Sequence, residues 1–134
     1  MGIDVGGRRI GLAVSDASRT LARPLKTLEV TDVAAGVTAV AKEVDQLMQD
    51  DDGVATIVVG MPRHLDGSPN AQTPIVVAFV DALRATVPCE VVTVDERLTS
   101  VEADERLSVK TKDWRQRKKQ LDAAAAAIIL QDYL

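Results

Sequence analysis

The chain has 134 residues, of which 46% are hydrophobic and 27% charged, so its composition is that of a folded protein and excludes a disordered or fibrous one. Its single cysteine, Cys89, excludes an internal disulfide framework, and no apolar run approaches the roughly 20 residues that cross a bilayer. We therefore expect one cytoplasmic domain over residues 1–134, without contact with a membrane.

Charge is spread unevenly along the chain. The net charge is −4, but residues 110–119 contain six Lys or Arg and one acid, a local charge of +5, while the rest of the chain carries −9. Such polarity suits a protein that gathers metal ions at one place and phosphates at another. Aromatic residues make up only 2% of the chain, which excludes stacking of bases on aromatic rings as its way of holding nucleic acid.

In chain order, the sequence first predicts three strands in an antiparallel meander, at residues 2–5, 10–15 and 25–30. Gly6 and Gly7 form a tight turn between the first two strands. Only three residues precede Asp4 in the first strand, so we expect a few native N-terminal residues to be missing.

Helices and strands then alternate. Thr31 is expected to cap a helix that ends at residues 50–53, and the apolar residues of this helix keep a 3.6-residue spacing: Val33, Val37, Val40, Val44 and Leu47. A buried strand at 56–59 and a loop at 60–73 precede a helix that opens with Thr73 and Pro74 and buries Ile75, Val76, Phe79, Val80 and Leu83. The last expected elements are a strand at 91–94, a short helix starting with a capping box at 99–102, a mobile polar stretch at 108–115 and a helix at about 117–133.

This order of elements predicts an α/β fold in which a mixed five-stranded sheet is flanked by helices on both faces. Ligands of such sheets gather at the carboxyl ends of the parallel strands. Asp4, Glu96 and the loop after Gly60 all fall at or near strand ends, so we expect the functional site there.

Three acidic positions are candidates for chemistry. Asp4 stands inside a strand, where a carboxylate is costly unless it is paired or binds a cation; the alternative is an exposed position on a frayed terminal strand. Asp95 and Glu96 follow a strand and point to opposite faces, so only one of them can share a site with Asp4. The other would brace Arg97 or cap the next helix, unless both belong to an ordinary acidic loop.

Asp122 is expected to point inward, because on a helix it shares a face with Ala125, Ala126, Ile129 and Tyr133. The alternative is that Asp122 is the N-cap of the alanine run. Three carboxylates on two strand ends and one helix could form an oxygen-only site for Mg²⁺ or Mn²⁺. His64 is the only histidine, which excludes a zinc site built from His and Cys.

Basic and backbone groups near this site could hold phosphate. The loop at 60–68 offers backbone N–H groups and Arg63 to a phosphate, and His64 could assist proton transfer or be an ordinary loop histidine. The basic run at 110–119 is the natural track for a phosphodiester backbone; otherwise it is a solvated helix face.

Four motifs, in order along nearly the whole chain, resemble the YqgF/RuvX family, whose members have a ribonuclease-H-like fold. They are Gly-Ile-Asp-Val-Gly-Gly-Arg-Arg-Ile-Gly-Leu-Ala-Val-Ser-Asp at 2–16, Val-Val-Gly-Met-Pro at 58–62 with Asp66-Gly67, Val-Asp-Glu-Arg-Leu-Thr-Ser at 94–100, and Lys-Lys-Gln-Leu-Asp at 118–122 with the alanines and Ile-Ile-Leu at 128–130. The family is described as Holliday-junction resolvases and as nucleases that trim the 5′ end of pre-16S ribosomal RNA.

The resemblance implies a Mg²⁺- or Mn²⁺-dependent nuclease that acts on structured nucleic acid, either pre-rRNA or branched DNA. By the same resemblance Asp4, Glu96 and Asp122 would be the metal-binding catalytic acids, with Asp95 in place of Glu96 if strand alternation runs the other way. The residues that would contact the nucleic-acid backbone are Arg8, Arg63, Arg97, Lys118 and Lys119. The stretch at 107–117 departs from the family pattern, because it lacks the usual helix-ending glycine.

Two other classes of function fit parts of the sequence. Asp4 to Gly7 also matches the first phosphate loop of actin-like and sugar-kinase folds, but those need two such domains and 134 residues supply one. A non-catalytic nucleic-acid-binding module on a nuclease-like scaffold is the other alternative. A junction resolvase would further need two active sites that face two strands, hence a homodimer.

Overall fold

The computed structural model describes residues 1–50, 53–95 and 114–134, and in the last helix it describes side chains from Gln120 onward. The elements in chain order are β1 (Gly2–Val5), β2 (Arg9–Ser15), β3 (Ala22–Glu29), α1 (Val33–Gln49), β4 (Thr56–Met61), α2 (Thr73–Thr86), β5 (Glu90–Asp95) and α4 (Trp114–Tyr133). No helix in these ranges is long and apolar enough to cross a bilayer.

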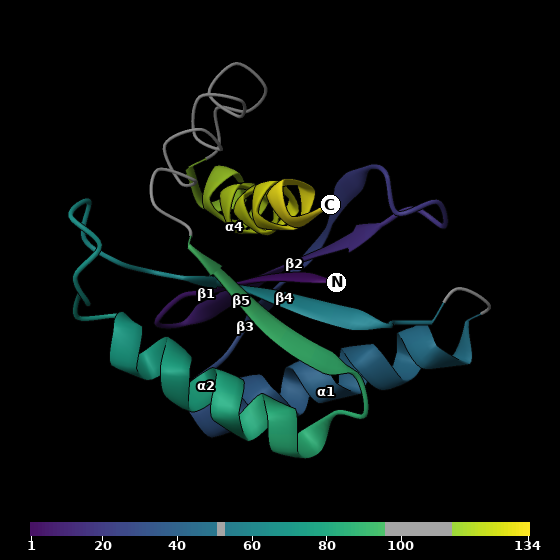
Figure 1. Ribbon diagram of the computed structural model, residues 1–134, viewed down its shortest axis with the longest axis horizontal. Coiled ribbons are helices and arrows are strands. Elements are labelled where there is room, and N and C mark those ends of the chain that lie inside the picture. The colour runs from purple at the N-terminus through teal and green to yellow at the C-terminus, as the bar shows by residue number, and fades with distance from the viewer. Residues whose placement is uncertain (51–52, 96–113) are drawn as a thin grey trace.

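The strands form one mixed sheet in the order β3-β2-β1-β4-β5. β1, β2 and β3 pair antiparallel, with Ile3 opposite Leu12, whereas β4 runs parallel to both β1 and β5. Helices α1 and α2 cover one face of the sheet, and α4 covers the other (Figure 1). The predicted mixed five-stranded sheet with helices on both faces is therefore confirmed.

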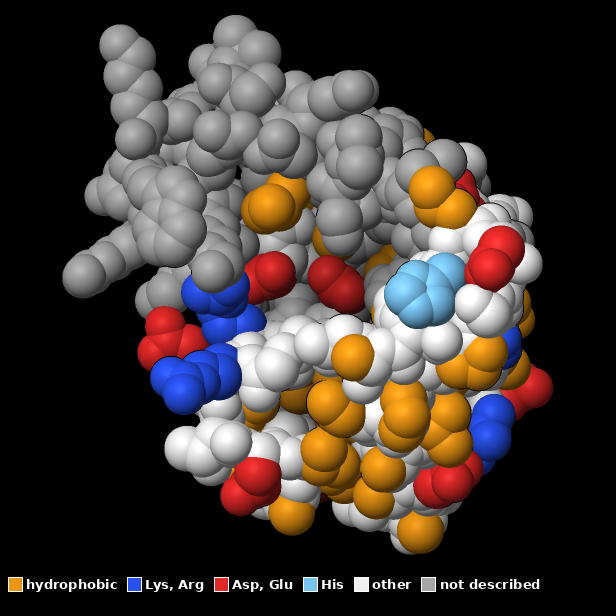
Figure 2. Space-filling model, turned by 90° about the vertical axis from the view of Figure 1, so that its left-hand side faces the viewer, with side chains coloured by type: hydrophobic (Ala, Val, Ile, Leu, Met, Phe, Trp, Pro, Cys, Tyr) orange, Lys and Arg blue, Asp and Glu red, His pale blue; other side chains and the backbone are white. Residues whose placement is uncertain are grey.

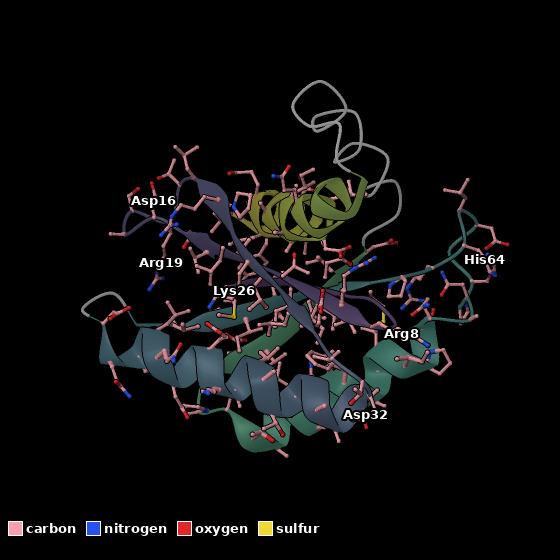
Figure 3. All side chains as sticks on the ribbon, turned by 180° about the vertical axis from the view of Figure 1, so that it is seen from behind. Arg8, Asp16, Arg19, Lys26, Asp32 and His64 are labelled. Atoms are coloured by element: carbon pink, nitrogen blue, oxygen red, sulfur yellow. The ribbon has the colours of Figure 1, made fainter. Side chains whose placement is uncertain are left out.

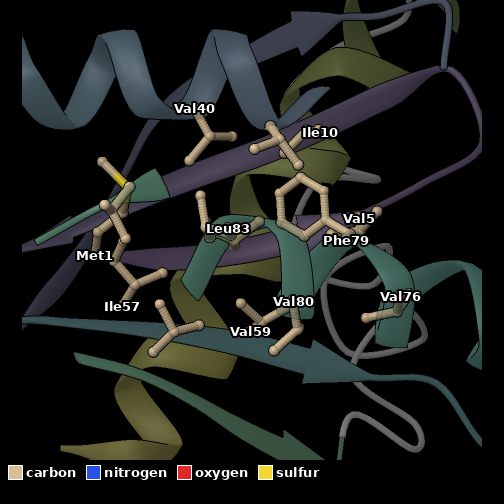
Figure 4. Packing of buried hydrophobic residues seen from close by; sticks show 14 of the residues in the cluster. Met1, Val5, Ile10, Val40, Ile57, Val59, Val76, Phe79, Val80 and Leu83 are labelled. Carbon is tan, nitrogen blue, oxygen red and sulfur yellow. The ribbon is translucent and has the colours of Figure 1, made fainter. Parts of the chain in front are cut away.

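Large aliphatic side chains fill the layer between the sheet and helices α1 and α2. Strand alternation sends Ile3, Ile10 and Leu12 into this layer, where they pack with the helix residues Phe79 and Leu83 (Figure 4). All five side chains are at most 1% exposed, and each such burial stabilises the fold by roughly 1.5–3 kcal/mol. The predicted α1 stripe is confirmed, since its members all lie in this cluster or against it: Val33, Val37, Val40, Val44 and Leu47.

On the opposite face of the sheet, glycines on β1 and β2 let α4 lie close to these two strands. A Cβ added at Gly2 would meet the Ala126 carbonyl oxygen at 2.6 Å, and one at Gly11 would overlap the Asp122 carbonyl. Ala126 and the two apolar residues Ile129 and Leu130 pack there against Ala13 and Val58. The helix backbone therefore rests almost directly on β1 and β2.

Several boundaries differ from the sequence-based predictions. The N-cap of α1 is Asp32 rather than Thr31, because the Asp32 carboxylate accepts the Ala35 N–H at 2.8 Å and Thr31 lies one residue too early for this bond. β4 continues through Gly60 to Met61, which pair with β5, so the expected loop begins later. Ile75 is 39% exposed and does not belong to the inner stripe of α2.

The expectations for the segment before α4 lie mostly outside the described residues. These are the short helix at 99–102 and most of the stretch at 108–115 that was expected to be mobile, since residues 96–113 are not described. α4 starts at Trp114, earlier than the expected start at about residue 117.

Candidate functional site

Asp4 lies where the sequence predicted, on β1 next to the carboxyl end of the strand. Its neighbours Ile3 and Val5 point into the core with α1 and α2, so Asp4 faces α4. Its side chain is half-buried, which excludes the alternative of an exposed position on a frayed strand. Ligands of such sheets gather at the carboxyl ends of the parallel strands, so the position of Asp4 marks this end of the sheet as a candidate site.

Asp122 is brought to the same face by the close approach of α4. In the antiparallel register Asp4 is opposite Gly11, and the backbone of α4 at Asp122 lies directly over Gly11. Because α4 begins at Trp114, Asp122 lies well inside the helix, and the alternative that it caps the alanine run is wrong. The structure therefore places Asp4 and Asp122 on one face at the carboxyl end of β1.

Arg9 is a site residue that the sequence-based reasoning missed. Its Nε donates a hydrogen bond to Oδ2 of Asp122 at 2.7 Å, across 113 residues of chain. The side chains of Arg9 and Asp122 are 28% and 23% exposed. Strand alternation in the sequence could have identified Arg9, because Arg9 shares a face of β2 with Gly11 and Ala13, the residues on which α4 packs.

Asp95, the alternative to Glu96, lies on the wrong face of the sheet. Val92 and Val94 pack in the cluster under α4, whereas Val91 packs in the core with α1 and α2. Strand alternation gives Asp95 the face of Val91, opposite to that of Asp4. Glu96 and Arg97 are outside the described residues.

Among residues 1–50, 53–95 and 114–134, no three His, Cys, Asp or Glu side chains gather closely enough to hold a metal ion. Glu96, the third acid that the resemblance implies, is not among these residues. Asp4 and Asp122 are the two predicted acids whose place the structure gives, and both offer the hard oxygen ligands that Mg²⁺ and Mn²⁺ prefer.

The loop after β4 folds back on itself. The N–H groups of His64 and Gly67 donate to the Ser68 and His64 carbonyls at 2.9 Å, and Nη1 of Arg63 donates to the Gly67 carbonyl at 3.3 Å. Hydrogen bonds from the Ser68 hydroxyl and N–H hold the pKa of Asp66 below its ordinary value. The N–H groups of His64, Gly67 and Ser68, which were expected to bind a phosphate, are therefore engaged in hydrogen bonds within the loop.

The basic candidates Arg8 and Arg63 and the imidazole of His64 are all exposed. Arg8 and His64 lie at the same end of the molecule (Figure 3). At this end acidic side chains sit in a hollow, with basic side chains on one side of it and the histidine on the other (Figure 2). Lys118 and Lys119 belong to α4, and their side chains are outside the description.

A cavity of about 450 Å³ lies at the opposite end of the sheet, between the β2–β3 turn and the end of α4, and contains none of the candidate acids. Asp16 orders that turn. Its carboxylate accepts the N–H groups of Thr20 at 2.8 Å and Leu21 at 3.2 Å, and these bonds hold the pKa of Asp16 below its ordinary value. Asp16 and Arg19 lie at the far end of the molecule from Arg8 and His64 (Figure 3).

Comparison with known proteins gives matches over the whole chain. A family model described as "RuvX: Holliday junction resolvase" matches residues 1–134. A protein of Chloroflexus aggregans is 40% identical over 134 residues, which cover 100% of this chain and 91% of that protein. A protein of Roseiflexus sp. is 41% identical over 135 residues, covering 100% and 92%. Both carry the name "Putative pre-16S rRNA nuclease".

Among solved structures, T. thermophilus RuvC in complex with a Holliday junction substrate has a TM-score of 0.46 to this chain. The two sequences are 14% identical, and the match covers 92% of this chain and 88% of that one.

Proposed function

Because this chain belongs to the RuvX family, whose model is described as Holliday junction resolvase, we propose that it is a metal-dependent nuclease that cleaves phosphodiester bonds in structured nucleic acid. The observation that carries the proposal is the convergence of Asp4 and Asp122. One comes from a central strand and the other from a helix that is held over that strand by glycine and alanine. Together these two elements bring carboxylate oxygens to one place, which is what a site for a hard divalent cation needs.

We propose Asp4, Glu96 and Asp122 as the acids that bind Mg²⁺ or Mn²⁺. Asp95 lies on the face away from Asp4, so the next residue along an alternating strand, Glu96, is the one expected on the side of Asp4. When bound between such carboxylates, these cations activate water and stabilise the charge that develops on a phosphodiester. Asp4 and Asp122 supply oxygen ligands of the required kind and contribute no nitrogen or sulfur ligand that would favour zinc.

The nucleic-acid backbone would be held by basic residues around these acids. Arg8 and Arg63 are exposed and come from the β1–β2 turn and the loop after β4, at the carboxyl ends of the parallel strands. Arg97 follows β5 in the sequence, and Lys118 and Lys119 precede Asp122 on α4. Contacts from such side chains position a phosphate backbone without reading its sequence, as suits an enzyme that recognises structure.

The experiment that tests the proposal is cleavage with Mn²⁺ or Mg²⁺ of a four-way DNA junction and a structured precursor rRNA, side by side. We expect Asp4→Asn to keep the fold and to lose cleavage by on the order of a thousandfold or more, because it removes a charged ligand of the cation. Asp45→Asn, a change of the same kind on the exposed side of α1, should cleave like the wild type. Equal cleavage by Asp4→Asn and Asp45→Asn would sink the assignment.

The outcomes also separate the remaining alternatives. Paired symmetric nicks in the junction would identify a resolvase, and the protein should then be a homodimer by analytical ultracentrifugation, because two strands need two active sites. Trimming of the rRNA with intact junctions would identify a nuclease of ribosome maturation. If neither substrate is cut, Mn²⁺ does not bind, and Asp4→Asn binds nucleic acid as the wild type does, the non-catalytic nucleic-acid-binding module is the correct description.

A further inference from the structure

Arg9 makes a directed hydrogen bond to the carboxylate of Asp122. It is the first residue of β2, and it shares its face of the sheet with Gly11, over which the backbone of Asp122 rests. Nε is the guanidinium atom that contacts the carboxylate, and the contact to Oδ2 at 2.7 Å has the short length of a charge-assisted hydrogen bond. The contact therefore constrains the rotation of the Asp122 carboxyl group.

The Arg9–Asp122 pair is not what holds α4 on the sheet. Both side chains are more than a fifth exposed, and ion pairs at such positions add little to stability. α4 is already anchored by Ala126, Ile129 and Leu130, which are at most 2% exposed against Ala13 and Val58. A bond that the helix does not need for its attachment, made to a proposed metal-binding acid, suggests a role at the site.

The role that we infer for Arg9 is to orient the Asp122 carboxylate. Residues that hydrogen-bond to metal ligands fix the orientation of those ligands, and losing them typically costs about 10–100-fold in metal affinity or activity. A carboxylate that accepts a hydrogen bond at one oxygen can still coordinate a cation through the other. We propose that Arg9 is a positioning residue, which holds the Asp122 carboxylate in the orientation that binds Mg²⁺ or Mn²⁺; this rests on the proposed function.

Two substitutions of similar size separate positioning from charge. In Arg9→Gln the side-chain amide nitrogen stands as many bonds from Cα as Nε does in arginine, so an N–H donor is kept while the positive charge is lost. In Arg9→Met the terminal methyl group takes that position, so both the donor and the charge are lost. Arg23→Met, on an exposed position of β3, is the matched control for removing an arginine.

The measurement is Mn²⁺ binding by isothermal titration calorimetry to each variant without nucleic acid, followed by cleavage kinetics and thermal unfolding. We expect Arg9→Met to weaken Mn²⁺ binding by about 10–100-fold and to lower kcat, with little change in KM for the nucleic acid. Arg9→Gln should keep most of the affinity, and Arg23→Met should bind Mn²⁺ like the wild type. Thermal unfolding should be nearly the same for all of them, which shows that each variant folds.

Four results would overturn the role of Arg9. Unchanged Mn²⁺ binding by Arg9→Met would mean that the contact does not position Asp122. Tighter binding would mean that Arg9 competes with the cation for the carboxylate. Equal losses in Arg9→Gln and Arg9→Met would mean that the charge acts rather than the directed N–H. If the wild type neither binds Mn²⁺ nor cleaves, the proposed function fails and the role of Arg9 fails with it.

Discussion

The two faces of the sheet are built on different principles. Between the sheet and helices α1 and α2, large side chains such as Phe79 and Leu83 interlock and are fully buried. Between the sheet and α4, Ile129 and Leu130 pack beside small residues, and the helix backbone approaches the strands as closely as Gly2 and Gly11 permit. Side-chain size sets the distance between a helix and a sheet, so the first face gains stability and the second gains proximity.

Proximity is what the candidate site requires. An aspartate side chain is short, so carboxylates on a strand and on a helix can share a cation only where the two backbones come close. Asp4 and Asp122 lie on the face where that condition holds, whereas Asp95 lies on the other one. The comparison therefore predicts that changes on the α1 and α2 face alter stability and changes under α4 alter the site.

The largest loss of stability is expected from Phe79→Ala, which empties the centre of the α1 and α2 face. Phe79 is 0% exposed, and truncating a buried phenylalanine typically costs about 3–5 kcal/mol. Val77→Ala on the same helix, where Val77 is 43% exposed, should change stability by less than about 0.5 kcal/mol. Urea unfolding measures both. Folded Phe79→Ala should still bind Mn²⁺ like the wild type, and a matching loss of Mn²⁺ affinity would contradict the division between the faces.

A smaller loss of stability with a larger effect on the site is expected from Gly11→Ala. The added methyl group would overlap the Asp122 carbonyl, a backbone atom that cannot move away without α4. Overpacking of this kind costs about 1–3 kcal/mol, and it should displace Asp122 from Asp4 and so abolish cleavage. Gly7→Ala is the matched control, because nothing lies within 4 Å of a Cβ there. Full activity of a folded Gly11→Ala would refute the requirement for close approach.

The N-cap of α1 gives a prediction of about 1 kcal/mol. Asp32→Ala removes the acceptor of the Ala35 N–H and should destabilise the protein by about that amount, because a helix N-terminus leaves such donors without partners. Thr31→Ala, one residue earlier, should leave the urea midpoint almost unchanged. The reverse order of effects would restore Thr31 as the cap. Neither substitution lies on the α4 face, so cleavage should be normal in both.

The smallest effect concerns the β2–β3 turn, which Gln131 of α4 holds through hydrogen bonds of 2.9 Å to Ala22 and Thr20. The N–H groups of Thr20 and Leu21 hold the pKa of Asp16 below its ordinary value. A carboxyl group whose pKa is lower in the folded than in the unfolded state stabilises the fold when the pH is above its unfolded-state pKa. This stabilisation is lost as the pH falls through its folded-state pKa. Asp16→Ala should therefore be slightly less stable than the wild type near neutral pH.

Urea unfolding of the wild type and Asp16→Ala at about pH 6 and about pH 3 tests the predicted pH dependence of this stability difference. The difference between the wild type and Asp16→Ala should shrink at the lower pH, where the wild type loses the same contribution. An NMR titration of the Asp16 carboxyl carbon reports its pKa directly. A difference in stability that does not change with pH would show that the hydrogen bonds to Asp16 do not depend on its charge.

Much of the fold followed from local patterns. The α1 stripe with its 3.6-residue spacing and the β-branched run of β4 identified their elements because each pattern reports which side of its own backbone is buried. Boundaries were less accurate, as Thr31 and Gly60 show. An N-cap depends on which carboxylate reaches a particular N–H, and the end of β4 depends on its pairing with β5.

By itself the sequence determined the order of the described strands and helices, the inward stripe of α1 and the family to which the chain belongs, because these depend on residues close together in the chain. Only the tertiary structure decided that Asp122 lies inside a helix over Gly11, that Asp95 points away from Asp4, and that Arg9 contacts Asp122 across 113 residues. Each of these depends on how closely two separate elements pack, and that distance is a property of their contact.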